Sequence, residues 1–220
     1  MKKIIAAVIF ILIIAGCGPS SRIISSWKAN NIQPHQFNKI MVLGLINIPD
    51  RTLREKMEDH IAGDLKEMGY NAVCSCDEFD PKTFENMSEK QALEKLSGSG
   101  IDAVLTIVLL DKAKERYYVP ENIYYSPYFI YHDSFWGYYR TMYGRVYGPG
   151  YYAVSTKYFW ESNFYALGEK QLIYSAQSQS FDPASAQALG HEYGQMIAKD
   201  MVKKNVVVNL SKQKPAEKPM

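Results

Sequence analysis

Residues Thr52–Tyr70, TLREKMEDHIAGDLKEMGY, carry the clearest amphipathic pattern in the chain and decide its fold class. Apolar side chains recur there at spacings of four, four, four and three residues, which places them on one face of an α-helix. They are Leu53, Met57, Ile61, Leu65 and Met68. Thr52 with Glu55 fits a capping box at the start, and Gly69 fits the C′ position after the end. The pattern predicts a helix with one buried face.

The polar side of this helix carries several acidic residues beside Arg54 and Lys56. They are Glu55, Glu58, Asp59 and Asp64. Because oppositely charged neighbours at helical spacing are typical of a solvated helix face, we interpret these carboxylates as exposed.

Short apolar runs on both sides of the helix predict strands. They are KIMVLGL at 39–45, NAVCS at 71–75 and IDAVLTIVLL at 101–110. Ser88 with Gln91 fits a second capping box, which opens a helix in SEKQALEKLSGSG that ends at glycines. Helices between strands imply right-handed crossovers and a partly parallel sheet. The first half therefore reads as a β-α-β-α-β unit.

In the second half of the chain, the apolar pattern changes from helical spacing to partial alternation. Tyr152–Leu167 and Gln171–Phe181 predict two strands of an antiparallel hairpin around a glycine-containing turn. Asp182-Pro183 suits the start of a closing helix, and Asn205–Leu210 predicts a last short strand. The apolar stripe of the closing helix consists of Leu189, Tyr193, Met196, Ile197 and Met201. We expect the α+β variant of an α/β fold, with a mixed sheet, a hairpin and a closing helix.

The amino-terminal segment predicts export and a lipid anchor. Lys2 and Lys3 precede the apolar run Ile4–Ile14, which is too short to span a bilayer and suits a signal peptide. Ile14-Ala15-Gly16-Cys17 resembles the bacterial lipobox. That resemblance implies cleavage before Cys17 and attachment of several acyl chains to it, which exceeds the marginal binding of a single chain. The alternative is an ordinary secretory signal with an incidental cysteine.

The residues after the cysteine bear on location and on domain limits. Gly18 stands where an aspartate would favour the inner membrane, and no acidic cluster follows, so the lipobox resemblance implies the periplasmic leaflet of the outer membrane. We expect a signal peptide at 1–16 and a lipidated cysteine with a tether at 17–36. A single α/β domain should span 37–210 with a tyrosine-rich insert at 117–151, followed by a disordered tail at 211–220.

Four segments, in this order, carry a family resemblance. They are KIMVLGL, TLREKMEDHIAGDLKEMGYNAV, LEKLSGSGIDAVLTIVL and NFYALGEKQLIYSAQSQSF. The chain resembles the small α/β domain of envelope lipoproteins related to the curli-secretion lipoprotein, the penicillin-binding-protein activator lipoproteins and the amino-terminal domain of TolB. The resemblance implies a fold, and fold does not imply function. The long tyrosine-rich insert departs from the family pattern.

Composition and motifs argue against several functions. Removal of residues 1–16 leaves 204 residues with 23 basic and 23 acidic side chains, so no strong field attracts nucleic acid. His191-Glu192 lacks the second histidine of a zinc protease because residue 195 is Gln, and His35, His60 and His132 lack metal-ligand spacing. We predict no catalytic residue, no metal and no cofactor.

Cys74 and Cys76 form a C-x-C pair at the end of a predicted strand. The cell envelope permits a disulfide, but two cysteines two apart in an extended strand lie near the upper geometric limit for one. A metal site would call for a second pair, and none exists. We expect two small buried residues, with a disulfide as the alternative.

Fourteen of the seventeen tyrosines lie between Tyr117 and Tyr165. Three interpretations remain open: rings that pack on the domain, a recognition surface, or an insertion at the lipid headgroups. The candidate surface consists of Tyr124, Tyr125, Tyr128, Tyr131, Trp136, Tyr139, Arg140, Tyr143 and Arg145. The main hypothesis is a non-catalytic, lipid-anchored envelope protein that binds an envelope protein or glycan. The alternatives are an oligomeric assembly or secretion component of the outer membrane and, second, a periplasmic hydrolase.

Overall fold

The computed structural model describes residues 20–30, 32, 37–47, 51–79, 83–120, 136, 139 and 150–212. The chain divides into two compact units. Unit 1 comprises Met1–Lys112 and Tyr158–Met220, and unit 2 comprises Ala113–Lys157. We expected one domain over 37–210. The chain instead divides into two units, and the first strand begins before residue 37, at Ser21.

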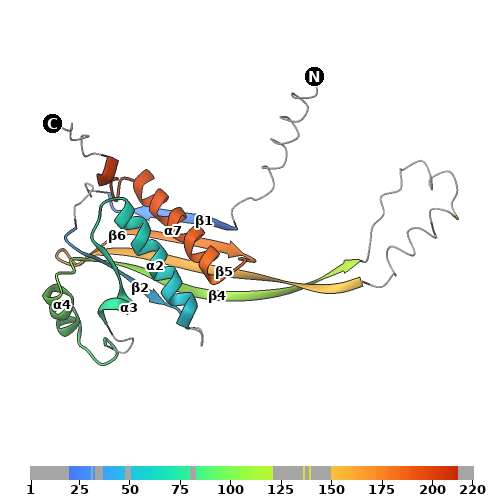
Figure 1. Ribbon diagram of the computed structural model, residues 1–220, viewed down its shortest axis with the longest axis horizontal. Helices are drawn as coiled ribbons and strands as arrows, with labels where there is room; N and C mark the ends of the chain where they lie inside the picture. Colours follow the sequence, from blue (N-terminus) through green and yellow to red (C-terminus); the bar gives the residue numbers. More distant parts are fainter. Residues whose placement is uncertain are drawn as a thin grey trace, which may run out of the picture. The chain divides into compact units, whose positions relative to one another are not determined.

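A six-stranded sheet in the order β1-β6-β5-β4-β2-β3 forms the framework (Figure 1). β2 (Ile40–Leu45) pairs in parallel with both β3 (Ala72–Cys74) and β4 (Ala103–Pro120). β1 (Ser21–Lys28) pairs antiparallel with β6 (Gln171–Phe181), and β5 (Gly150–Ala166) lies between β6 and β4. This mixed sheet confirms the predicted α/β class in its α+β form.

Helices cover both faces of the sheet. α2 (Arg51–Glu67) and α7 (Ala186–Lys203) lie side by side on one face (Figure 1). α4 (Glu89–Gly98) belongs to a separate core cluster, and α3 (Ser75–Glu78) and the 3-10 helix η2 (Leu210–Lys212) are short. Successive side chains of β2 point to opposite faces of the sheet and so contribute to both cores. Ile40 and Val42 pack with α2 and α7, and Met41 packs with Leu96 of α4. Within the described residues, no helix has the length and apolar character needed to cross a membrane.

The amphipathic helix and its end follow the prediction. Its five apolar stripe residues are all buried, and Gly69 has a φ of 95°, which favours glycine. Ser88 caps α4 through a capping box with Gln91. The start of α2 differs, because the helix begins at Arg51 and Thr52 lies inside it.

The carboxy-terminal part corrects two predictions. Ser185, rather than Asp182, caps α7, since its Oγ accepts a hydrogen bond from the Ala188 N–H at 3.0 Å. The segment 205–210 forms no strand, because Asn205 has a φ of 54° and turns the chain after α7. Val206 and Val207 are instead buried in the larger core.

The predicted tether contains a strand. Residues 21–28 pair with β6 as β1, so the expectation of a tether over 17–36 was wrong for this part. Ser21 is buried, and its Oγ lies 2.7 Å from the Oγ of Ser180. A serine-rich edge strand is held by main-chain pairing rather than by an apolar face, so periodicity does not reveal it.

β4 and β5 extend well beyond the predicted strands, to Pro120 and from Gly150. The two strands run antiparallel, because residues further along β4 contact residues that come earlier in β5. In unit 1, Thr106 Oγ1 donates to the Asn163 carbonyl at 3.2 Å, and in unit 2, Lys157 Nζ lies 2.7 Å from the Glu115 carboxylate. The first residues of the predicted insert at 117–151 therefore belong to β4, and its last residues belong to β5.

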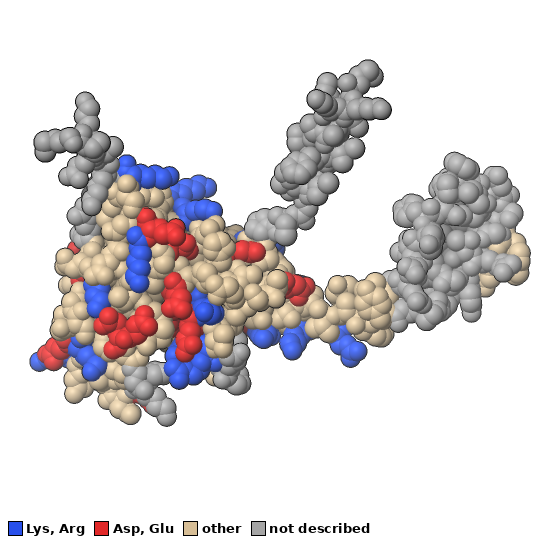
Figure 2. Space-filling model, in the orientation of Figure 1, with Lys and Arg blue, Asp and Glu red and all other residues tan. Residues whose placement is uncertain are grey.

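Charges are mixed on the face of unit 1 that Figure 2 shows. Figure 2 shows basic and acidic side chains interspersed on the face that it presents. This agrees with the nearly balanced composition of the chain.

Glycine allows α2 and α7 to approach closely. A Cβ atom at Gly190 of α7 would lie 2.8 Å from the Lys56 carbonyl oxygen of α2. Backbone atoms at that distance cannot rotate away, so the two helices would have to move apart. Gly63 in α2 has no atom within 4 Å of an added Cβ and provides a matched control.

We expect Gly190→Ala to destabilise the protein by about 1–3 kcal/mol, as overpacking of a core does. Gly63→Ala should raise stability by about 0.5–1 kcal/mol, because alanine is the better helix former. Urea unfolding followed by circular dichroism measures both. Equal or higher stability of Gly190→Ala would contradict the close packing of the two helices.

Candidate functional site

A pocket of about 400 Å³ lies at the carboxyl ends of β2 and β3. It is lined by 43–47 at the end of β2, by Arg54 of α2, and by Ser75, Phe79 and Phe84 after β3. The chain leaves β2 for α2 in the larger core, and it leaves β3 for residues that pack with α4 in the other core. Ligands of open α/β sheets bind in the crevice where successive connections diverge in this way. The topology therefore places the pocket where such folds bind ligands.

Glu58 lies fully buried beside this pocket. Its Oε1 accepts a hydrogen bond from the Gly44 N–H at 2.8 Å, and its Oε2 accepts one from Ser75 Oγ at 2.8 Å and one from the Cys76 N–H at 3.3 Å. A Cβ atom at Gly44 would lie 2.9 Å from Oε1, so glycine admits the carboxylate to the β2 backbone. The carboxylate thus joins the ends of β2 and β3 to α2.

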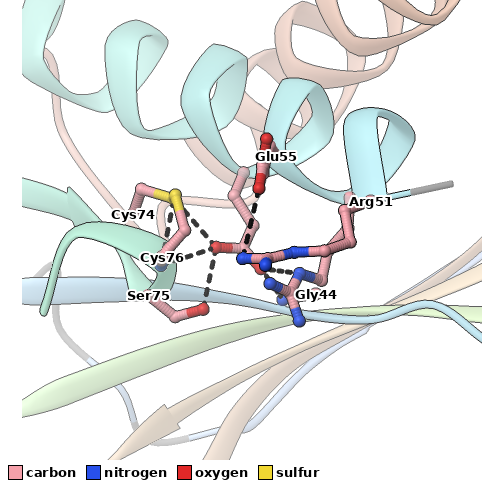
Figure 3. Close-up of polar contacts among 8 residues, drawn as sticks. Gly44, Arg51, Glu55, Cys74, Ser75 and Cys76 are labelled. Carbon is pink, nitrogen blue, oxygen red and sulfur yellow. Dashed lines mark hydrogen bonds and ion pairs between the residues drawn. A yellow bond between two sulfur atoms is a disulfide. The ribbon is translucent and has the colours of Figure 1, made fainter. Parts of the chain in front are cut away.

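Figure 3 shows how this cluster is arranged: Cys74, Ser75 and Cys76 lie on one side, and Arg51 and Glu55 lie on the other. Burial raises the pKa of Glu58, and hydrogen bonds from Ser75, Gly44 and Cys76 together with the Arg54 charge oppose that rise. The interpretation of Glu58 as a solvated residue was wrong. The signal that could have found it is its place directly after Met57 and three residues before Ile61, both of which are buried.

Arg54 brings a cation to the pocket. Its Nε lies 3.7 Å from Glu58 Oε1 and, within the described part of the chain, this buried atom makes no hydrogen bond. The pocket is thus lined by this arginine side chain, by Ser75 and by two phenylalanine rings. This combination suits a small ligand with an acidic group and an apolar part.

Cys74 and Cys76 form a disulfide, which corrects the expectation of two unlinked residues. The chain turns from β3 into α3 between them, so they do not stand in a straight strand, and their Cα atoms lie 5.2 Å apart. Cys74 is buried and Cys76 is half-buried. Ligand atoms of Asp59, Cys74, Cys76 and Asp77 lie within 4.8 Å of one another, but the two bonded sulfurs cannot bind a metal as thiolates, and we assign no metal site.

Of the predicted aromatic surface, the structure describes Trp136 and Tyr139. Their rings stack with centroids 5.5 Å apart, and the two residues are 63% and 43% exposed. The other candidates lie outside the described residues: Tyr124, Tyr125, Tyr128, Tyr131, Arg140, Tyr143 and Arg145. Cys17 also lies outside them.

Unit 2 adds exposed aromatic residues that were not among the predicted candidates. Tyr117, Tyr151 and Tyr152 are 53%, 62% and 63% exposed, and the Arg116 guanidinium lies 5.1 Å from the centre of the Tyr152 ring. Their signal was their place in the tyrosine-rich stretch. The sequence predicted a strand that begins at Tyr152, but it did not place Tyr117 and Tyr151 in strands.

The raised pKa of Glu58 predicts a pH-dependent stability. The folded protein binds the proton more tightly than the unfolded chain, so the free energy of unfolding falls as pH rises above about 4.5 towards the folded pKa. Glu58→Gln should reduce this slope, by at most about 1.4 kcal/mol per pH unit for one proton. Part of the slope should remain, because burial also raises the pKa of Asp64. Urea midpoints between pH 4.5 and 8 measure it, and an unchanged slope in Glu58→Gln would contradict the assignment.

No protein-family model matches the chain, and no curated protein matches it. Among solved structures, it resembles the PelC dodecamer from Paraburkholderia phytofirmans at 11% identity, over 82% of this chain and 94% of that one, with a TM-score of 0.42. It also resembles lipoprotein GNA1162 from Neisseria meningitidis at 16% identity, over 75% of this chain and 98% of that one, with a TM-score of 0.41. TM-scores below 0.5 carry no argument about function, so the function is proposed from the residues of this chain.

Proposed function

We propose that this chain is a non-catalytic, lipid-anchored envelope protein that binds a partner in the periplasm through the exposed aromatic residues of unit 2. Acyl chains on Cys17 anchor it to the periplasmic leaflet of the outer membrane. The partner is an envelope protein or a glycan. The observation that carries the proposal is the exposure of Tyr117, Tyr151 and Tyr152 on paired strands.

Several features of unit 2 support a recognition surface. Tyrosine and tryptophan offer a large apolar area with few rotatable bonds and keep a polar group for a hydrogen bond, and together with arginine they dominate binding hot spots. The Arg116 guanidinium of β4 lies within cation–π distance of the Tyr152 ring of β5. The same aromatic faces stack on sugar rings, which keeps a glycan among the partners.

The lipid anchor rests on the lipobox resemblance of residues 14–17. We expect Cys17→Ser to abolish incorporation of labelled palmitate and to move the protein from the membrane to the soluble fraction. Because several acyl chains supply the membrane affinity, losing them removes most of it. A Cys74→Ser, Cys76→Ser double variant is the control and should keep its label. Palmitate labelling that survives in Cys17→Ser would contradict the anchor.

The partner surface can be tested by photo-cross-linking in living cells. A photoreactive amino acid at Tyr152 or Trp136 should give a discrete adduct, whereas the same probe at Lys90, an 86% exposed side chain of α4, should not. Mass spectrometry of the adduct names the partner, and a band of twice the chain's mass would identify a second copy and favour the oligomeric alternative. Equal adducts from all three positions, or none, would contradict the proposal.

Alanine substitution measures how much the aromatic residues contribute. Tyr151→Ala with Tyr152→Ala should weaken the adduct from the Trp136 probe at least about tenfold, because a hot-spot side chain contributes about 2 kcal/mol or more. Ile24→Ala removes a 55% exposed side chain of unit 1 and should leave the adduct unchanged. The same loss in both variants would attribute the effect to general destabilisation.

A further inference from the structure

The Cys74–Cys76 disulfide contributes little as a structural staple. It closes a loop of only three residues. In the chain-entropy account, a bridge stabilises by restraining the unfolded chain, and this restraint grows with loop length. A bridge across three residues therefore restrains the unfolded chain far less than a long-range bridge would. Another role has to account for two cysteines at this position.

The two sulfurs have different surroundings. Cys74 is 2% exposed and Cys76 is half-buried, so Cys76 is the more accessible of the two residues to a partner in solution. The Cys76 N–H points to Cys74 Sγ at 3.2 Å, an arrangement that stabilises negative charge on Cys74. A buried sulfur with a donor beside it and a reachable sulfur two residues later form an asymmetric pair.

Glu58 Oε2 lies 2.9 Å from Cys74 Sγ. In the disulfide this sulfur carries no hydrogen, so a charged carboxylate gains nothing from the contact. Once the bond is reduced, the Cys74 thiol can donate to the carboxylate. The buried carboxyl group is therefore placed to exchange a proton with the one sulfur that solvent does not reach.

We propose that Cys74 and Cys76 form a thiol–disulfide exchange site in which Cys76 reacts with the partner and Glu58 exchanges the proton of Cys74. The substrates are a dithiol, which reduces the pair, and a partner disulfide, which the reduced pair reduces in turn. The proposal is independent of the aromatic surface of unit 2.

In the reducing direction, a partner thiolate attacks Cys76 Sγ and forms a mixed disulfide. The Cys74–Cys76 bond breaks, and its electron pair moves to Cys74 Sγ, which takes a proton from the Glu58 carboxyl group. The second thiolate of the partner then attacks the partner's own sulfur and releases Cys76. Two electrons have moved from the dithiol to the cysteine pair.

In the oxidising direction, the Cys76 thiolate attacks a partner disulfide and displaces one of its thiolates. Cys74 gives its proton to the Glu58 carboxylate and attacks Cys76 Sγ, which re-forms the intramolecular bond and releases the second partner thiolate. The cysteine pair is oxidised and the partner disulfide is reduced, so electrons balance.

The charged groups around the pair define the partner. Asp59 and Asp77 are exposed, and their oxygens lie within 4.8 Å of the sulfurs, whereas the Arg54 cation approaches Glu58 from the pocket. Two carboxylates beside Cys76 repel an anionic thiol and attract a cationic one. The site therefore fits a cysteine flanked by basic side chains, with cystamine as the simplest probe and glutathione disulfide as its anionic counterpart.

The test uses the full mature protein in detergent and reads the cysteines by mass. Trypsin releases residues 67–82, which contain Cys74 and Cys76 but not Cys17. We expect native wild-type protein to be reduced by dithiothreitol, with two maleimide labels appearing together on this peptide. The reduced protein should react with cystamine faster than with glutathione disulfide, and this preference should weaken at high salt. A bond that dithiothreitol reduces only in urea would overturn the proposal.

Single-cysteine variants test the asymmetry. Cys74→Ser should keep a stable mixed disulfide with cystamine on Cys76, and Cys76→Ser should react at least about tenfold more slowly, because its remaining sulfur is buried. Limiting maleimide on reduced wild-type protein should label Cys76 first, which tests the same point without a substitution. Equal reactivity of the two sulfurs in folded protein would overturn the assignment of Cys76.

Glu58→Gln tests the proton exchange. It should slow closure of the disulfide in the reduced protein about a hundredfold, the usual contribution of a positioned acid–base group, and should flatten the pH profile of closure. Glu55→Gln is the matched control, since its carboxylate lies on the same helix and pairs with Arg51 at 3.4 Å. Closure at the wild-type rate in Glu58→Gln, or equal slowing in both variants, would overturn the role of Glu58.

Discussion

Helix α2 lies against β2 and β3 on one side and against α7 on the other. Its apolar stripe fills the larger core, and Gly190 lets the α7 backbone approach that of α2. Because α2 connects β2 to β3, its position also determines how the carboxyl ends of these two strands are placed. The core and the candidate site therefore depend on the same helix packing, and a change that tilts α2 would disturb both.

The packing of α2 buries Glu58, which is energetically unfavourable but places its carboxylate at the ends of β2 and β3. An ionised carboxylate is expensive to bury, and here three donors from β2, Ser75 and Cys76 compensate it in part. The same hydrogen bonds hold together the strand ends around the pocket. Glu58 thus links α2, the sheet and the cysteine pair. Its protonation affects both the stability of the fold and the exchange chemistry proposed for the disulfide.

Unit 2 follows a different principle. Its described strands expose aromatic and basic side chains instead of burying them, which costs stability unless a partner covers them. Unit 1 has mixed surface charge and no large field of one sign on the face in Figure 2, so binding by unit 2 would rest on aromatic contact rather than on steering by net charge. An anchor at Cys17 would confine this binding to one membrane surface.

Periodicity in the sequence determined the parts of the fold that bury a regular apolar face. The stripe of α2, the runs at 40–45 and 103–110 and the capping box of Ser88 with Gln91 are local patterns, and they predicted the helices and strands from which the mixed sheet follows. The sequence missed β1 because its serines pair through the main chain with a strand about 150 residues away. Only the tertiary structure showed that Glu58 is buried and that Cys74 and Cys76 are bonded. Both depend on how α2 packs across the ends of β2 and β3, which local spacing does not specify, because a side chain beside an apolar stripe is exposed or buried according to what covers it.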